Sequence, residues 1–147
     1  MSKGNTWEND LLLLVFNNTN AADIGDATGL RGSTTAGSLY VSLHTSNPDE
    51  TGNQTTGETS YASYDRVPVA RSGAGWTVTG NAVTNAALIQ FPQCTGGSAT
   101  LTHFAIGTAA YPGTGKILYK GALSSPLSVS SGIQPQFAAG DLDISED

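Results

Sequence analysis

Short runs of alternating apolar and polar residues, closed by turn-forming residues, dominate this sequence. The clearest run is 39–45, in which Leu39, Val41 and Leu43 recur at every second position. A side-chain period of two places these three residues on one face of a half-buried β-strand. Residues 46–52 are rich in Ser, Asn, Pro, Asp and Gly, which favour a loop over a continued strand. The chain is therefore expected to fold from short strands joined by polar loops.

The same pattern continues to the C-terminus. Two alternating runs, 76–79 and 82–85, flank Gly80-Asn81, which predicts a two-residue hairpin that pairs Val78 with Val83. Further strands are expected at 65–71, 87–91, 101–107, 116–119, 127–129, 136–138 and 142–144. This series of short strands predicts an all-β fold, an antiparallel β-sandwich of jelly-roll-like type, with one short N-terminal helix.

The helix is expected at 5–16, where Asn5 and Glu8 have the spacing of a capping box. Its apolar face is expected to comprise Trp7, Leu11, Leu14 and Val15. Other apolar residues extend this surface around the helix. Two readings follow: the helix packs wholly on its own sheet, or it also contacts a neighbouring subunit.

The chain has 147 residues, which suits a single domain with a core that needs no metal or disulfide. Within it, 1–38 is expected to form the N-terminal helix and an extended arm, and 39–147 the β-sandwich. Arg66 and Arg71 are expected outside or at the edges of their strand, with Val67 and Val69 inward.

Charge and hydropathy exclude two classes of partner. The net charge is −6 and the six basic residues are spread along the chain, so no patch for direct nucleic-acid binding is expected. No apolar run approaches a membrane span, and residues 11–16 are too short for a signal peptide. Synthesis in a cytoplasm and no entry into a membrane are therefore expected.

Catalytic and metal-binding patterns are missing from the sequence. His44 and His103 have no Cys or carboxylate at ligand spacing, and the lone Cys94 has no nearby base. Asp141 and Asp143 share one face of an expected strand. They are expected to form a solvated acidic tail, or alternatively a docking tail for a basic partner. We therefore expect no enzymatic activity, no metal and no cofactor.

Six segments carry a resemblance to a known family when they are taken in order: 39–45 with Pro48 and Gly52, 61–67, 85–87 with 91–92, 102–107, 117–123 and 137–142. Together they cover most of 39–144. In this order they resemble a family of small bacteriophage virion structural proteins, often labelled tail-fibre proteins. Some members resemble capsid cement, or decoration, proteins with a jelly-roll fold.

The resemblance implies a protein that binds the outside of an HK97-like shell and bridges capsomers. Its implied partners are the major capsid protein and further copies of itself, with a dimer favoured and a trimer possible. Its implied location is the capsid exterior of the virion, after assembly in the host cytoplasm. Two alternatives stay open. One is a tail-associated fibre or baseplate protein. The other is a carbohydrate-binding adhesion module that stacks sugars on Tyr40, Tyr61, Tyr64, Trp76 and Tyr111.

The candidate contact residues come from three places. The apolar helix surface contributes Trp7, Leu11 and Leu14. The polar loop at 47–58 is long for a small domain, and such loops are commonly functional. Its candidate contacts are Asn47, Pro48, Asp49 and Glu50. The acidic tail contributes Asp141 and Asp143.

Overall fold

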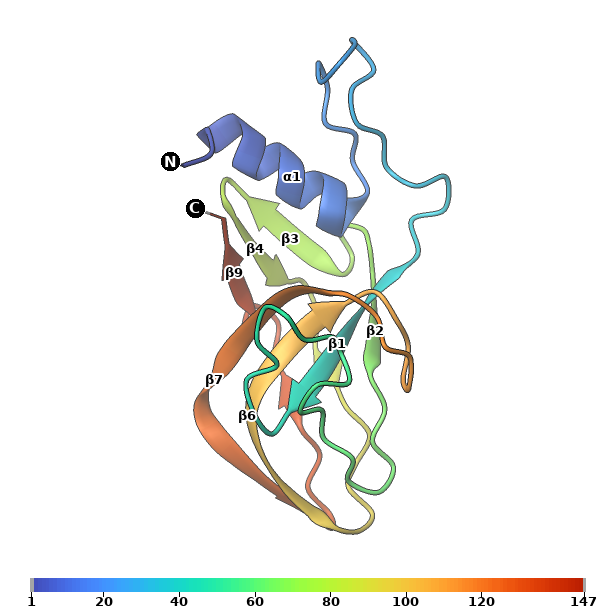
Figure 1. Ribbon diagram of the computed structural model, residues 1–147, viewed down its shortest axis with the longest axis vertical. Helices are drawn as coiled ribbons and strands as arrows, with labels where there is room; N and C mark the ends of the chain where they lie inside the picture. Colours follow the sequence, from blue (N-terminus) through green and yellow to red (C-terminus); the bar gives the residue numbers. More distant parts are fainter. Residues whose placement is uncertain (1, 147) are drawn as a thin grey trace. The chain divides into compact units, whose positions relative to one another are not determined.

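A computed structural model describes residues 2–146 of the protein (Figure 1). The elements in chain order are α1 (Asn5–Asn17), β1 (Ser38–His44), β2 (Val67–Ala70), β3 (Trp76–Thr79), β4 (Ala82–Asn85), β5 (Ile89–Gln90), β6 (Ser98–Gly107), β7 (Ile117–Ser130), β8 (Gln136–Phe137) and β9 (Asp143–Ser145). The predicted all-β class, with antiparallel sheets and one short N-terminal helix, is confirmed.

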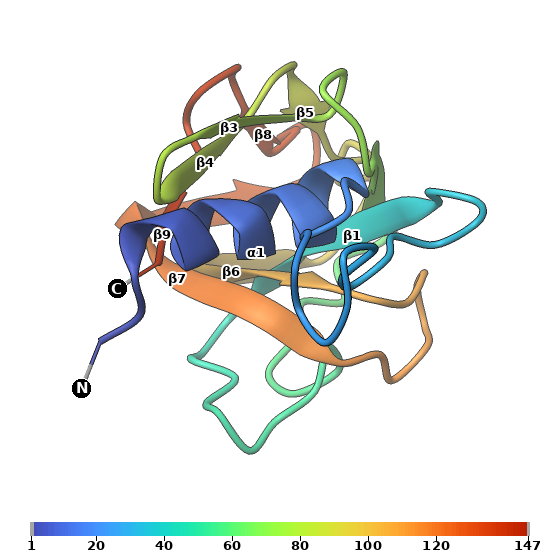
Figure 2. The same ribbon diagram turned by 90° about the horizontal axis from the view of Figure 1, so that it is seen from above.

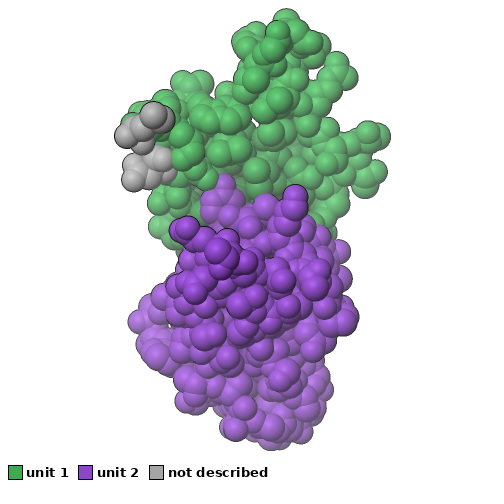
Figure 3. All heavy atoms as spheres, in the orientation of Figure 1, with its two compact units in different colours: residues 1–38, 69–89, 137–147 green, residues 39–68, 90–136 purple. Residues whose placement is uncertain are grey.

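The chain divides into two compact units, coloured separately in Figure 3. Unit 1 consists of residues 1–38, 69–89 and 137–147, and unit 2 of residues 39–68 and 90–136. Each unit is therefore built from stretches that are distant in sequence.

Unit 1 contains the three-stranded sheet β3-β4-β9, on which α1 packs (Figure 2). The predicted hairpin is confirmed, because Val78 pairs with Val83 and Gly80 adopts a positive φ of 60° in the turn. The ring of Phe16 meets the ring of Trp76 edge-on, with centroids 4.9 Å apart, and both side chains are fully buried. This aromatic contact fixes the helix on its sheet.

The start and the buried face of α1 differ from the prediction. Gly4 is the N-cap and no side chain caps the first turn, so the expected capping box is wrong. The buried helix residues are Glu8, Leu12 and Phe16, at a spacing of four. The predicted apolar face of Trp7, Leu11, Leu14 and Val15 is half-buried and is not the face that is fully buried. Apolar residues surround much of this helix, so its sequence alone does not determine which face is buried. The contact between Phe16 and Trp76 determines that face.

Unit 2 is dominated by the sheet β2-β1-β6-β7, whose strand β2 continues into unit 1. Antiparallel pairing aligns Leu43 of β1 with Phe104 of β6. The two expected strands at 116–119 and 127–129 are one long strand, β7. Its register on β6 jumps between Leu101 and His103, which leaves 123–126 in a bulge. Pro126 lies in that bulge, where its missing N–H does not interrupt the ladder.

Strand β1 is buried on both faces, whereas the sequence predicted a half-buried strand. Leu39, Val41 and Leu43 are buried as predicted, but Ser42 and His44 on the other face are fully buried too. His44 Nε2 lies 2.9 Å from Ser42 Oγ, and its Nδ1 lies 2.9 Å from the carbonyl oxygen of Thr56. The loop that contains Thr56 therefore covers the face expected to meet solvent.

Three other strands are shorter than expected, and one of them is β8, which ends at Phe137 where the strand was expected to reach residue 138. The segment 65–71 forms β2 only from Val67, and the segment 87–91 forms β5 only at Ile89–Gln90. The tail strand β9 begins at Asp143, so Asp141 precedes it.

Candidate functional site

The loop at 45–58 extends beyond β1 and projects below β7 in the view of Figure 2. It is held by side chains that point inward. The Gln54 side chain is fully buried, donates from Nε2 to the carbonyl oxygen of Tyr40 at 3.1 Å and accepts from the Ala109 N–H at 3.0 Å. A Cβ at Gly107 or Gly115 would collide with this amide, so a larger residue at either position would force the Gln54 side chain to move. The hydrogen bonds of Gln54 therefore hold the loop against β1 and the segment around Ala109.

A buried ion pair closes the loop at its C-terminal end. Arg66 Nε donates to Glu58 Oε1 at 2.7 Å, and Arg66 Nη2 donates to Glu58 Oε2 at 2.8 Å, a bidentate geometry. Arg66 Nη1 donates to the carbonyl oxygens of Ala109 and Gly113, at 2.9 and 2.7 Å. The expectation that Arg66 lies outside or at the edge is wrong, because its guanidinium satisfies its donors internally and is 0% exposed.

The ion pair is continuous with an aromatic cluster. Tyr64 Oη donates to Glu58 Oε1 at 2.8 Å and accepts from the Leu43 N–H at 3.1 Å. Burial and the nearby Glu58 carboxylate raise the pKa of Tyr64, so its hydroxyl stays protonated and donates. The ring of Tyr64 meets Tyr61 and Tyr111 edge-on at 5.3 Å. Strand β1, the loop and the turn at 109–113 are thereby joined.

These anchors leave the tip of the loop exposed. Asn47 Oδ1 accepts from the Asp49 N–H at 3.0 Å, and Asp49 adopts a positive φ of 58°. Asn47, Asp49 and Glu50 are exposed, whereas Pro48 is buried and therefore supports the tip from below. Of the four predicted loop contacts, three present their side chains to solvent.

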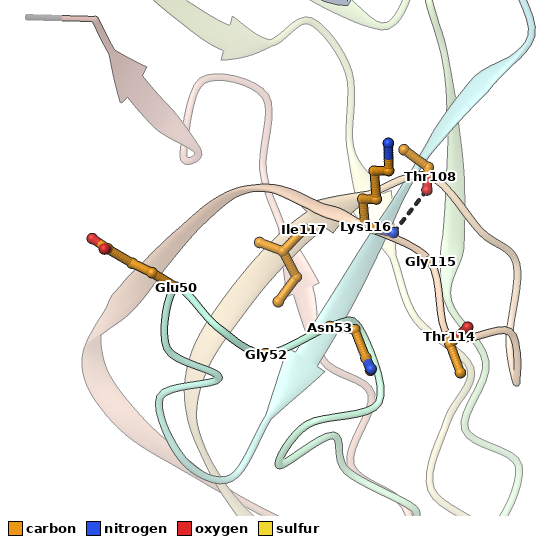
Figure 4. Close-up of a pocket in the computed structure, with 8 residues that line it drawn as sticks. All are labelled: Glu50, Gly52, Asn53, Thr108, Thr114, Gly115, Lys116 and Ile117. Carbon is orange, nitrogen blue, oxygen red and sulfur yellow. Dashed lines mark hydrogen bonds between the residues drawn. The ribbon is translucent and has the colours of Figure 1, made fainter.

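Two open clefts separate the loop tip from β7 and the turn before it. One of about 590 Å³ is lined by Glu50, Gly52, Asn53, Thr108, Thr114, Gly115, Lys116 and Ile117 (Figure 4). The other, of about 430 Å³, is lined by Asp49, Glu50, Ile117, Leu118, Tyr119 and Lys120. We call the second the loop–β7 cleft. It combines two carboxylates, one ammonium group and the side chain of Leu118, which is 37% exposed.

Unit 1 holds the other predicted contacts. Trp7, Leu11 and Leu14 lie on the half-buried side of α1, outside its buried row. The last turn of α1 is fixed by Arg71, which donates to the carbonyl oxygens of Val15 and Leu14, each at 2.7 Å. Arg71 is therefore engaged within unit 1 and does not lie free at a strand edge.

The acidic tail residues are both exposed. Asp141 Oδ2 accepts from the Ala138 N–H at 2.7 Å and so closes the turn before β9. Asp143 lies in β9 with its side chain in solvent.

Three of the proposed sugar-stacking aromatics do not reach solvent. Trp76, Tyr61 and Tyr64 are 0%, 5% and 7% exposed. Burial raises the pKa of Tyr61 to about 12, consistent with a phenol that donates to the carbonyl oxygen of Pro92. A flat ring must be accessible to stack on a sugar, so the predicted platform is reduced to Tyr40 and Tyr111.

The residues that brace the loop were mostly missed by the sequence reasoning. Gln54 has no pattern that marks it as buried, and Arg66 sits in an alternating run that placed it outside. The Tyr-x-x-Tyr spacing of 61 and 64, just before Arg66 and after Glu58, was the one available signal. Cys94 is a buried free thiol. Within residues 2–146, no three His, Cys, Asp or Glu side chains are grouped as a metal site.

Among the described residues, no helix is long and apolar enough to cross a membrane. A search of curated proteins found no match to the chain. A family model, described as podophage GP4 fiber I protein gp80, matches residues 2–145. This match spans nearly the whole chain and agrees with the resemblance to phage virion proteins. The chain therefore belongs to the podophage GP4 fiber I protein gp80 family and is a bacteriophage virion structural protein.

Proposed function

We propose that this virion protein is a capsid cement protein. It binds the outside of an HK97-like shell as a homo-oligomer and bridges neighbouring capsomers through the major capsid protein. The role is structural and needs no catalysis and no cofactor. Each copy adds a modest interface, and many copies on a closed shell sum these interfaces by avidity.

One observation carries this proposal: each unit presents its own candidate contact surface on a rigid support. In unit 1 the half-buried side of α1 bears Trp7, Leu11 and Leu14, and Arg71 fixes the end of the helix. In unit 2 the loop tip bears Asp49 and Glu50 above buried anchors. Two pre-organised surfaces suit a protein that joins separate neighbours, because little ordering entropy is lost when each one binds.

Copy number and location test the proposal. Quantitative mass spectrometry of purified virions is expected to give hundreds of copies, in a fixed ratio to the major capsid protein. Antibody-labelled virions are expected to carry the label over the head. A few to dozens of copies, or label restricted to the tail, would exclude the cement role.

The contact surface has its own test. The double substitution Trp7→Ala and Leu11→Ala is expected to lower shell occupancy and virion heat resistance. The matched control is Leu127→Ala, which removes an exposed apolar side chain of β7 outside both surfaces. Unchanged occupancy in the double variant would show that the helix does not touch the shell.

A tail-fibre or baseplate role is the second candidate, and the description of the matching family as a fiber protein favours it. The same labelling experiment separates the two, since a fibre protein places the label on the tail. An adhesion module is less well supported, because Trp76, Tyr61 and Tyr64 are buried. Binding of the purified protein to a glycan array would support the adhesion module instead.

A further inference from the structure

A gap opens in the main sheet of unit 2 where strand β1 ends. Antiparallel pairing of β1 with β6 stops at His44, which lies opposite His103. Strand β6 begins earlier in the sequence, at Ser98, and its residues 98–101 pair with β7 alone. In Figure 1, β6 and β7 continue below the arrowhead of β1. In the part of the chain that the structure describes, one backbone edge of β6 is therefore open over residues 98–101.

The segment 58–62 forms the other wall of this gap. It is held at both ends by isolated bridges, from Glu58 to the last residue of β1 and from Ala62 to Gly96. The Ala62 N–H donates to the Gly96 carbonyl oxygen at 3.0 Å, which closes the gap at that end. Between the bridges, the N–H of Ser60 forms no hydrogen bond within residues 2–146. Both walls thus offer backbone groups to the space between them.

The space between these walls is an open cleft of about 580 Å³, which we call the β6 slot. Four of its lining residues are too small to fill it: Ala62, Gly96, Gly97 and Ala99. Glu58 is the one charged residue of the lining, and its carboxylate already accepts two hydrogen bonds from Arg66. The β6 slot is therefore roomy and offers no free counter-charge to a ligand.

A buried hydroxyl group on the β6 slot lacks a partner. Thr59 lines the slot and is 2% exposed, and its Oγ1 forms no hydrogen bond with any residue that the structure describes. Buried polar atoms in folded proteins are nearly always paired. An unpaired hydroxyl beside an open cleft supports a ligand that completes this region.

We propose that the β6 slot binds an extended, uncharged peptide segment as an additional strand. The backbone of the peptide pairs with the open edge of residues 98–101, so main-chain hydrogen bonds supply the affinity. The peptide is uncharged because a buried charge without a partner is costly. A sugar fits less well, since Tyr61 is the one aromatic residue of the lining and is only 5% exposed. Under the proposed function the segment belongs to the major capsid protein; its source rests on that function, and the slot itself does not.

A peptide array tests the proposal. The purified protein is applied to short overlapping peptides that cover the major capsid protein and the other virion proteins of the same phage. An uncharged peptide of the major capsid protein is expected to bind. Ser60→Trp and Ala62→Trp place a large ring in the slot at exposed positions, and each is expected to weaken binding by about ten- to a hundred-fold. Ser125→Trp is the matched control, because Ser125 is an exposed serine of unit 2 outside the slot.

N-methylated peptides separate backbone pairing from side-chain recognition. A bound strand directs alternate N–H groups toward β6, so methylation of one alternate set is expected to abolish binding. Amide hydrogen exchange at residues 98–101 is expected to slow when the peptide is bound.

Three results would each overturn the β6 slot as a peptide site: no peptide binds, the Trp variants bind as well as the wild type, or every N-methylated peptide still binds. A binder found only in another virion protein would overturn the assignment to the major capsid protein. Labelled virions report the location of the protein independently, so a failure of the slot and a failure of the cement role can be told apart.

Discussion

The buried pair of Glu58 and Arg66 makes the strongest stability prediction. The substitution Glu58→Gln keeps the shape of the side chain but leaves the Arg66 guanidinium, 0% exposed, without its counter-charge. Breaking a buried pair from one side destabilises a protein by about 3–5 kcal/mol, because a desolvated charge is left uncompensated. In a chain of this size that loss corresponds to a decrease in Tm of roughly 10–16 °C.

Urea unfolding followed by circular dichroism measures this change. The matched control is Lys3→Met, which removes the pair of Lys3 with Glu146, where the nitrogen and oxygen lie 2.8 Å apart and the Lys3 side chain is 35% exposed. That pair is more exposed than the pair of Glu58 and Arg66, and it is expected to contribute less than about 1 kcal/mol. The double variant Glu58→Gln with Arg66→Met is expected to be more stable than the sum of its single variants predicts, since neither charge is then left alone. A loss below about 1 kcal/mol for Glu58→Gln would refute the reasoning, because the pair would then behave as an exposed one.

Three further predictions concern the core, the pH response and the loop anchor. Leu12→Ala is expected to lower the free energy of unfolding by about 2–5 kcal/mol and the half-buried Leu11→Ala by clearly less, as measured in urea; equal losses would contradict the assigned helix face. Burial lowers the pKa of His44 in the folded state, so the unfolded chain takes up a proton first as the pH falls below about 6.5, and stability should decrease there. A pH series of Tm should show this decrease in the wild type and a weaker one in His44→Gln; identical profiles would remove His44 as its source. Gly107→Ala is expected to destabilise by about 1–3 kcal/mol through collision with Gln54, and added Gln54→Ala should recover part of that loss in the same urea assay.

The strand content was predictable from residues 39–144 because local patterns determine it. Alternation identified β1, and the Gly80-Asn81 turn identified the β3–β4 hairpin with its register. Such features depend on neighbouring residues and on the backbone preferences of glycine and asparagine. Burial on the second face of β1 depends on Thr56, twelve residues away, which no local pattern reports.

The candidate site was only partly predictable, for a related reason. The loop was identified from its turn residues, and the exposure of Asp49 and Glu50 follows from their charge. Its anchors are polar side chains buried by partners from distant segments, as in the bonds between Gln54 and Ala109. Burial of Arg66 becomes favourable only once Glu58 and the turn at 109–113 surround it, so propensity placed it at the surface.

The interleaving of the two units has a consequence for how the chain is made. Strand β9 pairs with β4, with Ile144 opposite Val83, so the sheet beneath α1 gains this strand only after residues 143–145 have been synthesised. The stretches of unit 2 end at residue 136, so that unit has its full sequence earlier. The N-terminal helix is synthesised first but waits for β3 and β4 to bury Leu12 and Phe16. A nascent chain therefore exposes this apolar helix until residues 76–85 have been synthesised and can pack against it.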